Sequence, residues 1–198
     1  KGDVFFAVKG VHTDGRAFIE KACGAGASCV VAEKGDIGPC SVPVIEIDNL
    51  YRALGPIAAA YYGNSTAQMI GIAVTGTNGK TTTANWIADL MNRLGTPCAS
   101  IGTLGCTLNG IVLPSVSMTT PDPLTLQAKF AELLSRGCKA FAMEASSIGL
   151  EQGRLDGTEI KTAVFTNLTR DHLTITERWR TISGLRRSCS AGRRLPPR

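Results

Sequence analysis

The sequence contains no Cys-x-x-Cys pair, although seven cysteines are scattered along its 198 residues. Scattered cysteines in an odd number are typical of reduced thiols in a cytosolic protein, so we expect neither a zinc site nor a disulfide framework. No apolar run is long enough to cross a bilayer, and we therefore expect no membrane-spanning helix. The chain also lacks an internal repeat, a low-complexity segment and the Asn-Lys-x-Asp motif of guanine-binding proteins, and this last absence disfavours a GTPase.

Acidic residues are in the minority, because 21 Lys and Arg face 16 Asp and Glu, a net charge of +5. Residues 174–198 alone hold seven Arg and a single acidic residue, Glu177. The remaining 173 residues therefore carry 14 basic and 15 acidic groups. A basic tail on a nearly neutral body is not the charge pattern of a nucleic-acid-binding surface, so we expect no nucleic-acid partner.

The first 66 residues alternate short apolar segments with segments of helical spacing. The patterns predict strands at 3–8, 28–33 and 42–47 and helices at 15–27 and 49–62. Such alternation predicts a small α/β domain with a parallel sheet. The chain begins with Lys1 rather than Met, inside a strand pattern, so we expect the whole protein to extend upstream.

A second α/β pattern follows a polar break at 63–68, and we place the domain boundary after residue 66. Apolar runs predict strands at 69–75, 97–104, 139–147 and 162–168, with a helix after residue 79 that ends at Gly95 and a loop and helix over 119–138. The fold class predicted for the chain is α/β, with two domains at 1–66 and 67–173.

The segment Gly76–Thr82, with the sequence GTNGKTT, lies between a predicted strand and a predicted helix. Glycines allow successive N–H groups to turn towards an anion, and the N-terminus of the following helix favours the same anion. Lys80 could reach β- and γ-phosphates, and the Thr81 hydroxyl suits Mg²⁺. Because only two residues separate Gly76 from Gly79, the pattern is not a strict Walker A motif. The alternative is a tight strand–helix turn with an incidental lysine.

Two further polar groups follow predicted strands. Glu144 ends the apolar run AFAM, and Arg170–His172 follow the strand at 162–168. The carboxyl ends of parallel strands meet at one edge of the sheet, where α/β folds bind ligands. Glu144 could there hold Mg²⁺, although a solvated or capping glutamate is the alternative, and a lone His172 could be structural. The convergence of three strand ends predicts a single phosphate site.

Four segments, in this order and spacing, closely resemble the Mur ligases of peptidoglycan synthesis: VTGTNGKTTT (74–83), MTTPD (118–122), MEASSIGLEQGR (143–154) and FTNLTRDHL (165–173). They are most similar to the tripeptide synthetases of that family, and residues 2–27 resemble the N-terminal nucleotide-sugar domain of those enzymes. The resemblance covers residues 1–173. It implies a small N-terminal α/β nucleotide-sugar domain followed by an incomplete P-loop α/β domain of the Mur ligase central type.

The resemblance also implies an activity and its ligands. An ATP-dependent amide-bond ligase with Mg²⁺ would add a diamino acid, meso-diaminopimelate or L-lysine, to UDP-N-acetylmuramoyl-L-alanyl-D-glutamate through an acyl phosphate. By resemblance, the catalytic residues are Lys80, Glu144 and His172, and the Mg²⁺ ligands are Thr81, Glu144 and His172. The ATP-binding residues are Gly76, Thr77, Asn78, Gly79, Lys80, Thr81 and Thr82. The residues that contact the UDP-sugar precursor are Val11, His12, Thr13, Thr119, Thr120, Ser146, Gln152 and Arg154.

Several of these polar residues have simpler interpretations. Thr119 and Thr120 precede Pro121 and could equally be helix caps, and Ser146 could be a strand-end turn residue. Arg154 has the chemistry to bind a carboxylate or a phosphate.

The segment 174–198 departs from the family, in which the Arg-Asp-His-Leu motif continues as D-Y-H-G-T-M-E-N-Y and then A-K-A-K-L-F. One coding string for residues 174–182 yields D-Y-H-G-T-M-E-N-Y when a single G is restored before it. We therefore interpret residues 174–198 as a disordered, out-of-frame tail. The lost stretch would include the lysine that the family carbamylates to bind Mg²⁺, and the C-terminal domain that binds the diamino acid would also be lost. We expect this chain to be poorly stable and inactive as a ligase.

Two other functions remain open at this point. A folylpolyglutamate synthetase would usually have Gly-Ser after the loop lysine, where this chain has Thr81 and Thr82. A non-catalytic nucleotide-binding module would bind ATP or the UDP-sugar without turnover. For the ligase that the resemblance implies, we expect a cytoplasmic monomer that has no membrane or nucleic-acid partner.

Overall fold

The computed structural model describes residues 2–10, 13–114 and 119–167. The chain divides into two units, one from Lys1 to Leu54 and one that starts at Gly55. The division lies inside helix α2 (Leu50–Tyr61), whereas the sequence placed the domain boundary after residue 66, which stays a prediction. The expectations for Val11, His12, His172 and the tail 174–198 lie outside the described residues.

The first unit contains a parallel sheet with the strand order β1-β2-β3, as the alternating pattern predicted. Its core consists of small and branched side chains, with Ala7, Ile19, Val30 and Ala32 all buried. The elements are β1 (Val4–Ala7), η1 (Gly15–Phe18), α1 (Ile19–Gly24), β2 (Cys29–Glu33) and β3 (Val44–Ile47). The helix predicted at 15–27 begins as a 3-10 turn and continues as α1 to Gly24. The Asp14 side chain caps the 3-10 turn by accepting a hydrogen bond from the Arg16 N–H.

In the second unit, the described residues form a six-stranded sheet with the order β7-β6-β5-β8-β4-β9. The strands β5, β8, β4 and β9 are parallel, and β6 and β7 extend the sheet as an antiparallel hairpin. The elements are η2 (Ser65–Gln68), β4 (Ile70–Thr75), α3 (Lys80–Arg93), β5 (Cys98–Gly102), β6 (Gly105–Leu108), β7 (Ile111–Leu113), α4 (Pro123–Ser135), β8 (Ala140–Glu144), α5 (Ser147–Glu151) and β9 (Thr162–Phe165). The strands and helices that the sequence predicted in this region are present, but two strands are shorter than predicted. The strand predicted at 139–147 ends at Glu144, with Ser147 already in α5, and the strand predicted at 162–168 ends at Phe165.

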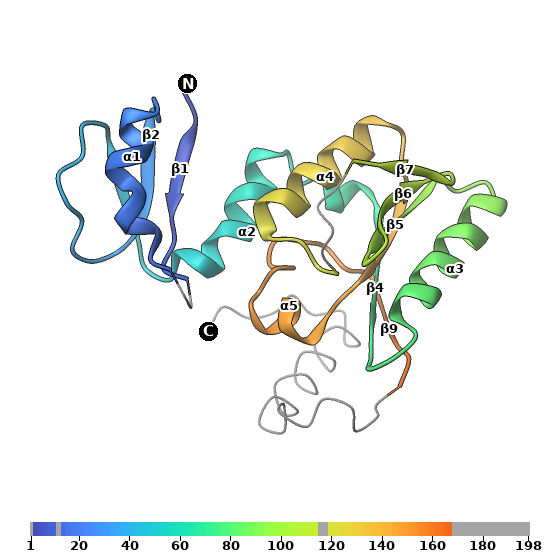
Figure 1. The fold of residues 1–198 in the computed structure, drawn as a ribbon. Helices are drawn as coiled ribbons and strands as arrows, with labels where there is room; N and C mark the ends of the chain where they lie inside the picture. Colours follow the sequence, from blue (N-terminus) through green and yellow to red (C-terminus); the bar gives the residue numbers. More distant parts are fainter. Residues whose placement is uncertain (1, 11–12, 115–118, 168–198) are drawn as a thin grey trace. The chain divides into compact units, whose positions relative to one another are not determined.

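Helices α3 and α4 cover opposite faces of this sheet (Figure 1). Successive strand residues alternate between the faces: Ile72 and Val74 pack towards α3, whereas Ala73 packs towards α4. The α3 face is lined by small side chains such as Ala84 and Ala142, which allow the helix to approach the strands closely. The α4 face holds the larger core residues, which are Leu126, Phe130, Leu133, Phe141 and Met143. Both faces of β5 and β8 are therefore buried, which is the usual state of central parallel strands.

The sequence analysis missed the hairpin β6–β7 and the short helix α5. The two hairpin strands are joined at Asn109 and Gly110, which both have positive φ, +50° and +77°. Asn-Gly is a strong signal for a two-residue hairpin turn, so the sequence did contain the information. Helix α5 has only five residues, too few for a helical period to be recognised.

β9 forms the edge of the sheet among the described residues, where it pairs with β4 alone. Phe165 on this strand is 48% exposed. Within the described ranges, no helix has the length and apolar character that a bilayer crossing requires.

We predict that Phe141→Ala lowers the free energy of unfolding by about 3–5 kcal/mol, because it would open a large cavity in the centre of the sheet. Phe141 is fully buried, and its ring lies 4.4 Å from that of Phe130 between centroids. Urea denaturation followed by circular dichroism would measure the loss. Leu104→Ala is the control, since Leu104 is 71% exposed and should change stability by less than about 0.5 kcal/mol. Equal losses in the two variants would contradict the packing described here.

Candidate functional site

The segment Gly76–Gly79 connects the end of β4 to the start of α3, as the sequence predicted. Gly79 is the N-cap of α3 at φ +83°, and it offers no side-chain cap to the first helical turn. The first N–H groups of the helix therefore face out of its end, together with the positive end of its dipole. The Lys80 ammonium donates hydrogen bonds to Gly76 O at 2.8 Å and to Thr77 O at 2.9 Å. These two bonds hold the loop around the Lys80 ammonium. An anion could bind beside it, at the N-terminus of α3.

Glu144 lies beside this loop at the end of β8 and is only 2% exposed. Its Oε1 atom accepts hydrogen bonds from Thr81 Oγ1 at 2.9 Å and from the backbone N–H of Thr103 at 2.8 Å. Its Oε2 atom accepts a longer bond, 3.3 Å, from Thr103 Oγ1. Burial of a carboxylate is costly unless its oxygens are hydrogen-bonded, and these three donors meet that requirement.

Two neighbours of Glu144 were missed by the sequence analysis. A side chain at Gly102 would collide with the Glu144 carboxylate, so that residue has to be glycine for the carboxylate to sit there. Thr103 follows Gly102 at the carboxyl end of β5, the same edge of the sheet as the other candidates. That shared edge is the signal by which Thr103 could have been found.

Thr81 and Glu144 are the two predicted Mg²⁺ ligands that the structure describes, and it brings them together. A hydroxyl and a carboxylate oxygen are the hard donors that Mg²⁺ prefers, and Mg²⁺ commonly takes the rest of its shell from water and phosphate. The residues present therefore fit this ion. Among the described residues there is no cluster of three or more His, Cys, Asp or Glu that could bind a metal by themselves.

The predicted substrate residues of the second unit lie close together around Thr120, which is 1% exposed. The Thr120 hydroxyl lies 3.0 Å from Ser146 Oγ and donates to the Glu144 carbonyl at 3.1 Å. Arg154 Nη1 donates to the Thr120 carbonyl at 2.7 Å, and Arg154 Nε donates to Gln152 Oε1 at 2.9 Å. These bonds hold the guanidinium in a single orientation.

Of the simpler interpretations of these residues, the structure supports the one for Ser146 and contradicts the one for Thr119 and Thr120. Ser146 is the N-cap of α5, since its Oγ accepts from Gly149 N–H at 3.0 Å, so the turn interpretation has a structural basis. The helix-cap interpretation of Thr119 and Thr120 is wrong, because Asp122 caps α4 by accepting from Thr125 N–H at 3.0 Å. Thr119 instead contacts Thr103, with 3.1 Å between their hydroxyl oxygens.

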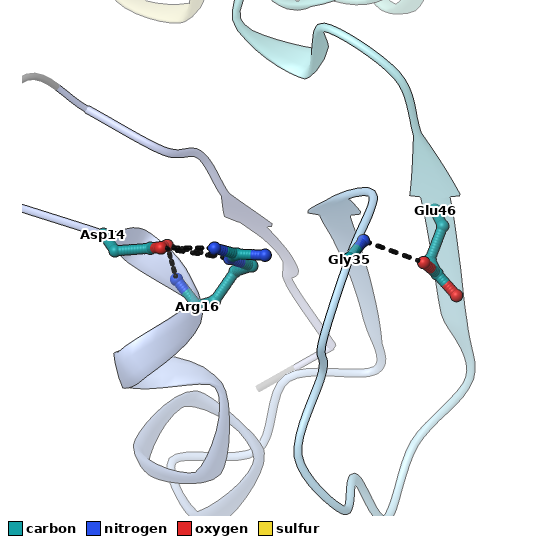
Figure 2. Close-up of polar contacts among 4 residues, drawn as sticks. All are labelled: Asp14, Arg16, Gly35 and Glu46. Atoms are coloured by element: carbon teal, nitrogen blue, oxygen red, sulfur yellow. Dashed lines mark hydrogen bonds and ion pairs between the residues drawn. The ribbon is translucent and has the colours of Figure 1, made fainter.

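In the first unit, Thr13 is the described member of the predicted group at 11–13. Its carbonyl accepts a hydrogen bond from Gly10 N–H at 2.9 Å. The next residue, Asp14, forms an ion pair with Arg16 at 2.7 Å (Figure 2). The Arg16 side-chain hydrogen bond, helped by the Arg16 backbone N–H, lowers the pKa of Asp14 to about 2. Gly35 donates to Glu46 at 3.3 Å, and a side chain at Gly35 would press on the Arg16 guanidinium (Figure 2).

Two family models match the chain. The family model of the Mur ligase middle domain matches residues 74–182, which is more than half of the chain. The chain belongs to the Mur ligase family. A second family model, described as the catalytic domain of the Mur ligase family, matches residues 1–62.

Curated relatives point to one branch of the Mur ligase family. The chain is 43% identical over 175 residues to the UDP-N-acetylmuramoyl-L-alanyl-D-glutamate--2,6-diaminopimelate ligase of Coxiella burnetii, with 87% of this chain and 36% of the relative aligned. It is 47% identical over 184 residues to the ligase of the same name from Ralstonia nicotianae, with coverages of 87% and 35%. The chain therefore spans about a third of the length of these relatives.

Solved structures of Mur ligases share the fold. A structure of a UDP-N-acetylmuramoyl-L-alanyl-D-glutamate--2,6-diaminopimelate ligase superposes with a TM-score of 0.75 at 34% identity, covering 87% of this chain and 35% of the other. The MurF ligase from Thermotoga maritima in complex with ADP superposes with a TM-score of 0.61 at 21% identity, covering 92% and 39%. The second likeness shows the fold alone.

We predict that the Asp14 carboxyl titrates near pH 2 and that Arg16→Met moves its pKa up towards the ordinary value of 3.8. Because the folded-state pKa is below the unfolded one, the ion pair contributes to stability above about pH 4, and this contribution disappears as pH falls towards 2. Carboxyl chemical shifts followed by NMR would check this. Arg93→Met, which removes the partner of Asp89 instead, should leave the Asp14 titration unchanged. A normal Asp14 titration in the unmodified chain would contradict the geometry.

Proposed function

We propose that residues 67–173 bind Mg²⁺-ATP, and that they belong to a ligase that adds a diamino acid to UDP-N-acetylmuramoyl-L-alanyl-D-glutamate. The observation that carries the proposal is the hydrogen bond of 2.9 Å between Thr81 Oγ1 and Glu144 Oε1, beside the glycine loop. It brings a metal-binding hydroxyl and carboxylate to the place where phosphates would lie. Family membership and the names of the relatives support the same conclusion.

The loop and the first turn of α3 would bind the phosphates. When bound, Mg²⁺-ATP would supply the phosphoryl group that activates the carboxylate of the precursor. Lys80 would exchange its bonds to Gly76 O and Thr77 O for phosphate oxygens, which keeps its charge at the centre of the loop. Thr81 and Glu144 would hold the metal. Phosphoryl transfer requires mainly positioning and charge neutralisation from a protein, and these residues supply both.

The precursor would contact the residues around Thr120. The guanidinium of Arg154 is fixed through Nη1 and Nε, and its Nη2 is the nitrogen that a carboxylate or phosphate of the precursor would meet. We infer that Thr119, Ser146 and Gln152 line the same region. In the first unit, Val11, His12 and Thr13 are inferred to contact the UDP-sugar, with Thr13 held by its bond to Gly10.

The identity of the diamino acid is inferred from the relatives. Their names favour 2,6-diaminopimelate over lysine. We infer that the protein is a monomer. A cytoplasmic location follows from the same proposal, because ATP is the co-substrate.

The 198-residue chain by itself is expected to bind nucleotide without forming tripeptide. It spans about a third of the length of its relatives, and their remaining residues would have to supply the other parts of a ligase. We predict no tripeptide product when the purified chain is incubated with Mg²⁺-ATP, UDP-N-acetylmuramoyl-L-alanyl-D-glutamate and diaminopimelate, as followed by mass spectrometry. Product above the level of a Lys80→Ala control would contradict this expectation.

We predict that Lys80→Ala weakens binding of a fluorescent ATP analogue by about tenfold or more, because it removes a charge-assisted hydrogen bond to phosphate. Equilibrium fluorescence titration in Mg²⁺ would measure the change. Lys139→Ala is the matched control. Lys139 is exposed and lies just before the amino end of β8, whereas the glycine loop lies at the carboxyl ends of the strands. If both variants bind as tightly as the unmodified chain, or if that chain binds no nucleotide, the proposed phosphate site is wrong.

Glu144→Gln tests the metal part of the proposal. The neutral amide keeps the size of the side chain but loses its charge, so Mg²⁺ should no longer raise the affinity for the ATP analogue, whereas it does so in the unmodified chain. Glu159→Gln, at an exposed position, is the control. Titrations with and without Mg²⁺ would separate the two effects. An undiminished Mg²⁺ effect in Glu144→Gln would remove Glu144 from the metal site.

A further inference from the structure

The chain that leaves β9 runs alongside the glycine loop and is bonded to it at several points. Thr166 N–H donates to Thr75 O at 3.0 Å, and Thr77 N–H donates to Asn167 O at 3.0 Å. The Asn167 side chain accepts from Asn78 N–H at 3.1 Å and donates through Nδ2 to Asn78 O at 3.0 Å. Thr166 Oγ1 donates to the same carbonyl at 2.6 Å. Segments 89 residues apart in sequence are therefore tied together at the phosphate loop.

The amide of Asn167 is chemically suited to this pairing. One planar group offers an acceptor and a donor side by side, and it uses them on the N–H and the C=O of a single residue, Asn78, as a neighbouring strand would. Aspartate has about the same shape but lacks the donor, and leucine lacks both. The pairing therefore specifies the side chain at position 167 as well as its backbone.

The bonds also determine which N–H groups of the loop point towards a ligand. The N–H groups of Thr77 and Asn78 donate to Asn167 and are therefore already occupied. The donors left to face an anion are those at the start of α3, from Gly79 onward. The Asn78 carbonyl, which would repel a phosphate, is held by two donors on the side of β9.

Gly76 allows the end of β9 to approach the loop closely. A side chain at this position would collide with Thr166 Oγ1 and would lie 3.0 Å from both the nitrogen and the oxygen of Asn167. Gly76 also has a φ of +142°, which other residues rarely adopt. The close approach of the β9 end therefore explains this glycine without reference to the phosphates.

We propose that Asn167 is a positioning residue for the phosphate loop: by pairing with both backbone groups of Asn78, it fixes the loop in its anion-binding shape before any nucleotide arrives. The inference rests on the proposed nucleotide-binding function and extends it to a residue that would not itself touch the nucleotide. Preorganisation of this kind lowers the conformational cost of binding, so its loss should appear in nucleotide affinity.

The chain offers a matched control on the same helix. Near the other end of α3, Asn92 makes an equivalent pair of bonds, accepting from Cys98 N–H at 2.7 Å and donating through Nδ2 to Cys98 O at 3.0 Å. Replacement of Asn92 removes a similar bridge from the same unit but leaves the phosphate loop intact. A comparison of the two sites separates positioning of the loop from general stability.

The test compares Asn167→Leu and Asn167→Asp with Asn92→Leu and Asn92→Asp in the 198-residue chain. The first readout is hydrogen exchange without nucleotide, where Asn167→Leu should speed exchange of the Thr77 and Asn78 amides and Asn92→Leu should not. The second is the dissociation constant for a fluorescent ADP analogue, which the Asn167 variants should raise by about tenfold and the Asn92 variants by less than about twofold. Circular dichroism should show folded protein for all four variants.

The outcomes are distinguishable. Faster loop exchange with unchanged ADP-analogue affinity in the Asn167 variants would overturn the positioning role, although the contact itself would exist. Unchanged exchange in Asn167→Leu would overturn the contact. If the unmodified chain binds no ADP analogue, the proposed nucleotide site fails and the positioning role with it, whereas the exchange data still report on the contact independently. Should Asn167→Leu fail to fold, Asn167→Asp, which keeps the acceptor for Asn78 N–H and loses only the donor to Asn78 O, decides the question by its affinity for the ADP analogue relative to that of Asn92→Asp.

Discussion

The parallel pairing of β4 with β8 on one side and with β9 on the other is the constraint on which the rest of the candidate site depends. In this register Val74 lies opposite Glu144, and Thr75 lies opposite Phe165. Three strands therefore end at the same level, and the residues that end or follow them lie close together. The glycine loop follows β4, Glu144 is the last residue of β8, and Asn167 comes two residues after β9.

A buried carboxylate links this site to the stability of the fold. Glu144 is almost fully buried, and its three hydrogen bonds come from two other elements, Thr81 on α3 and Thr103 after β5. Loss of any donor leaves part of the desolvation cost uncompensated, so the geometry around the carboxylate is strongly determined. The same bonds would preorganise the Thr81 and Glu144 oxygen atoms for the proposed cation. Thr81 and Glu144 thus hold the sheet ends together, and the same two residues would bind the metal.

Much of the fold could be predicted from local patterns, and the exceptions have physical reasons. The strands and helices of both units follow from apolar spacing, and the turn at Gly76–Gly79 follows from its glycines. The sequence left open whether Thr119 and Thr120 cap α4, because several capping residues precede Pro123, and the structure shows that Asp122 caps the helix. Thr103 was missed because it belongs to no motif, and Asn167 was missed as a partner of the loop because the segment FTNLTRDHL does not by itself show which residues its asparagine contacts. Their roles come from neighbours 41 and 89 residues away.

The sequence by itself determined the order of the elements, the position of the glycine loop and the resemblance to the Mur ligases, because each is a property of residues close together in the chain. The tertiary structure decided which strand ends became neighbours, since the order β5-β8-β4-β9 does not follow the chain. It therefore also decided that Glu144 bonds Thr81, that Arg154 is held by Thr120, and that Asn167 pairs with Asn78. Such contacts depend on the pairing of whole strands through their hydrogen bonds and buried faces, which no single motif specifies.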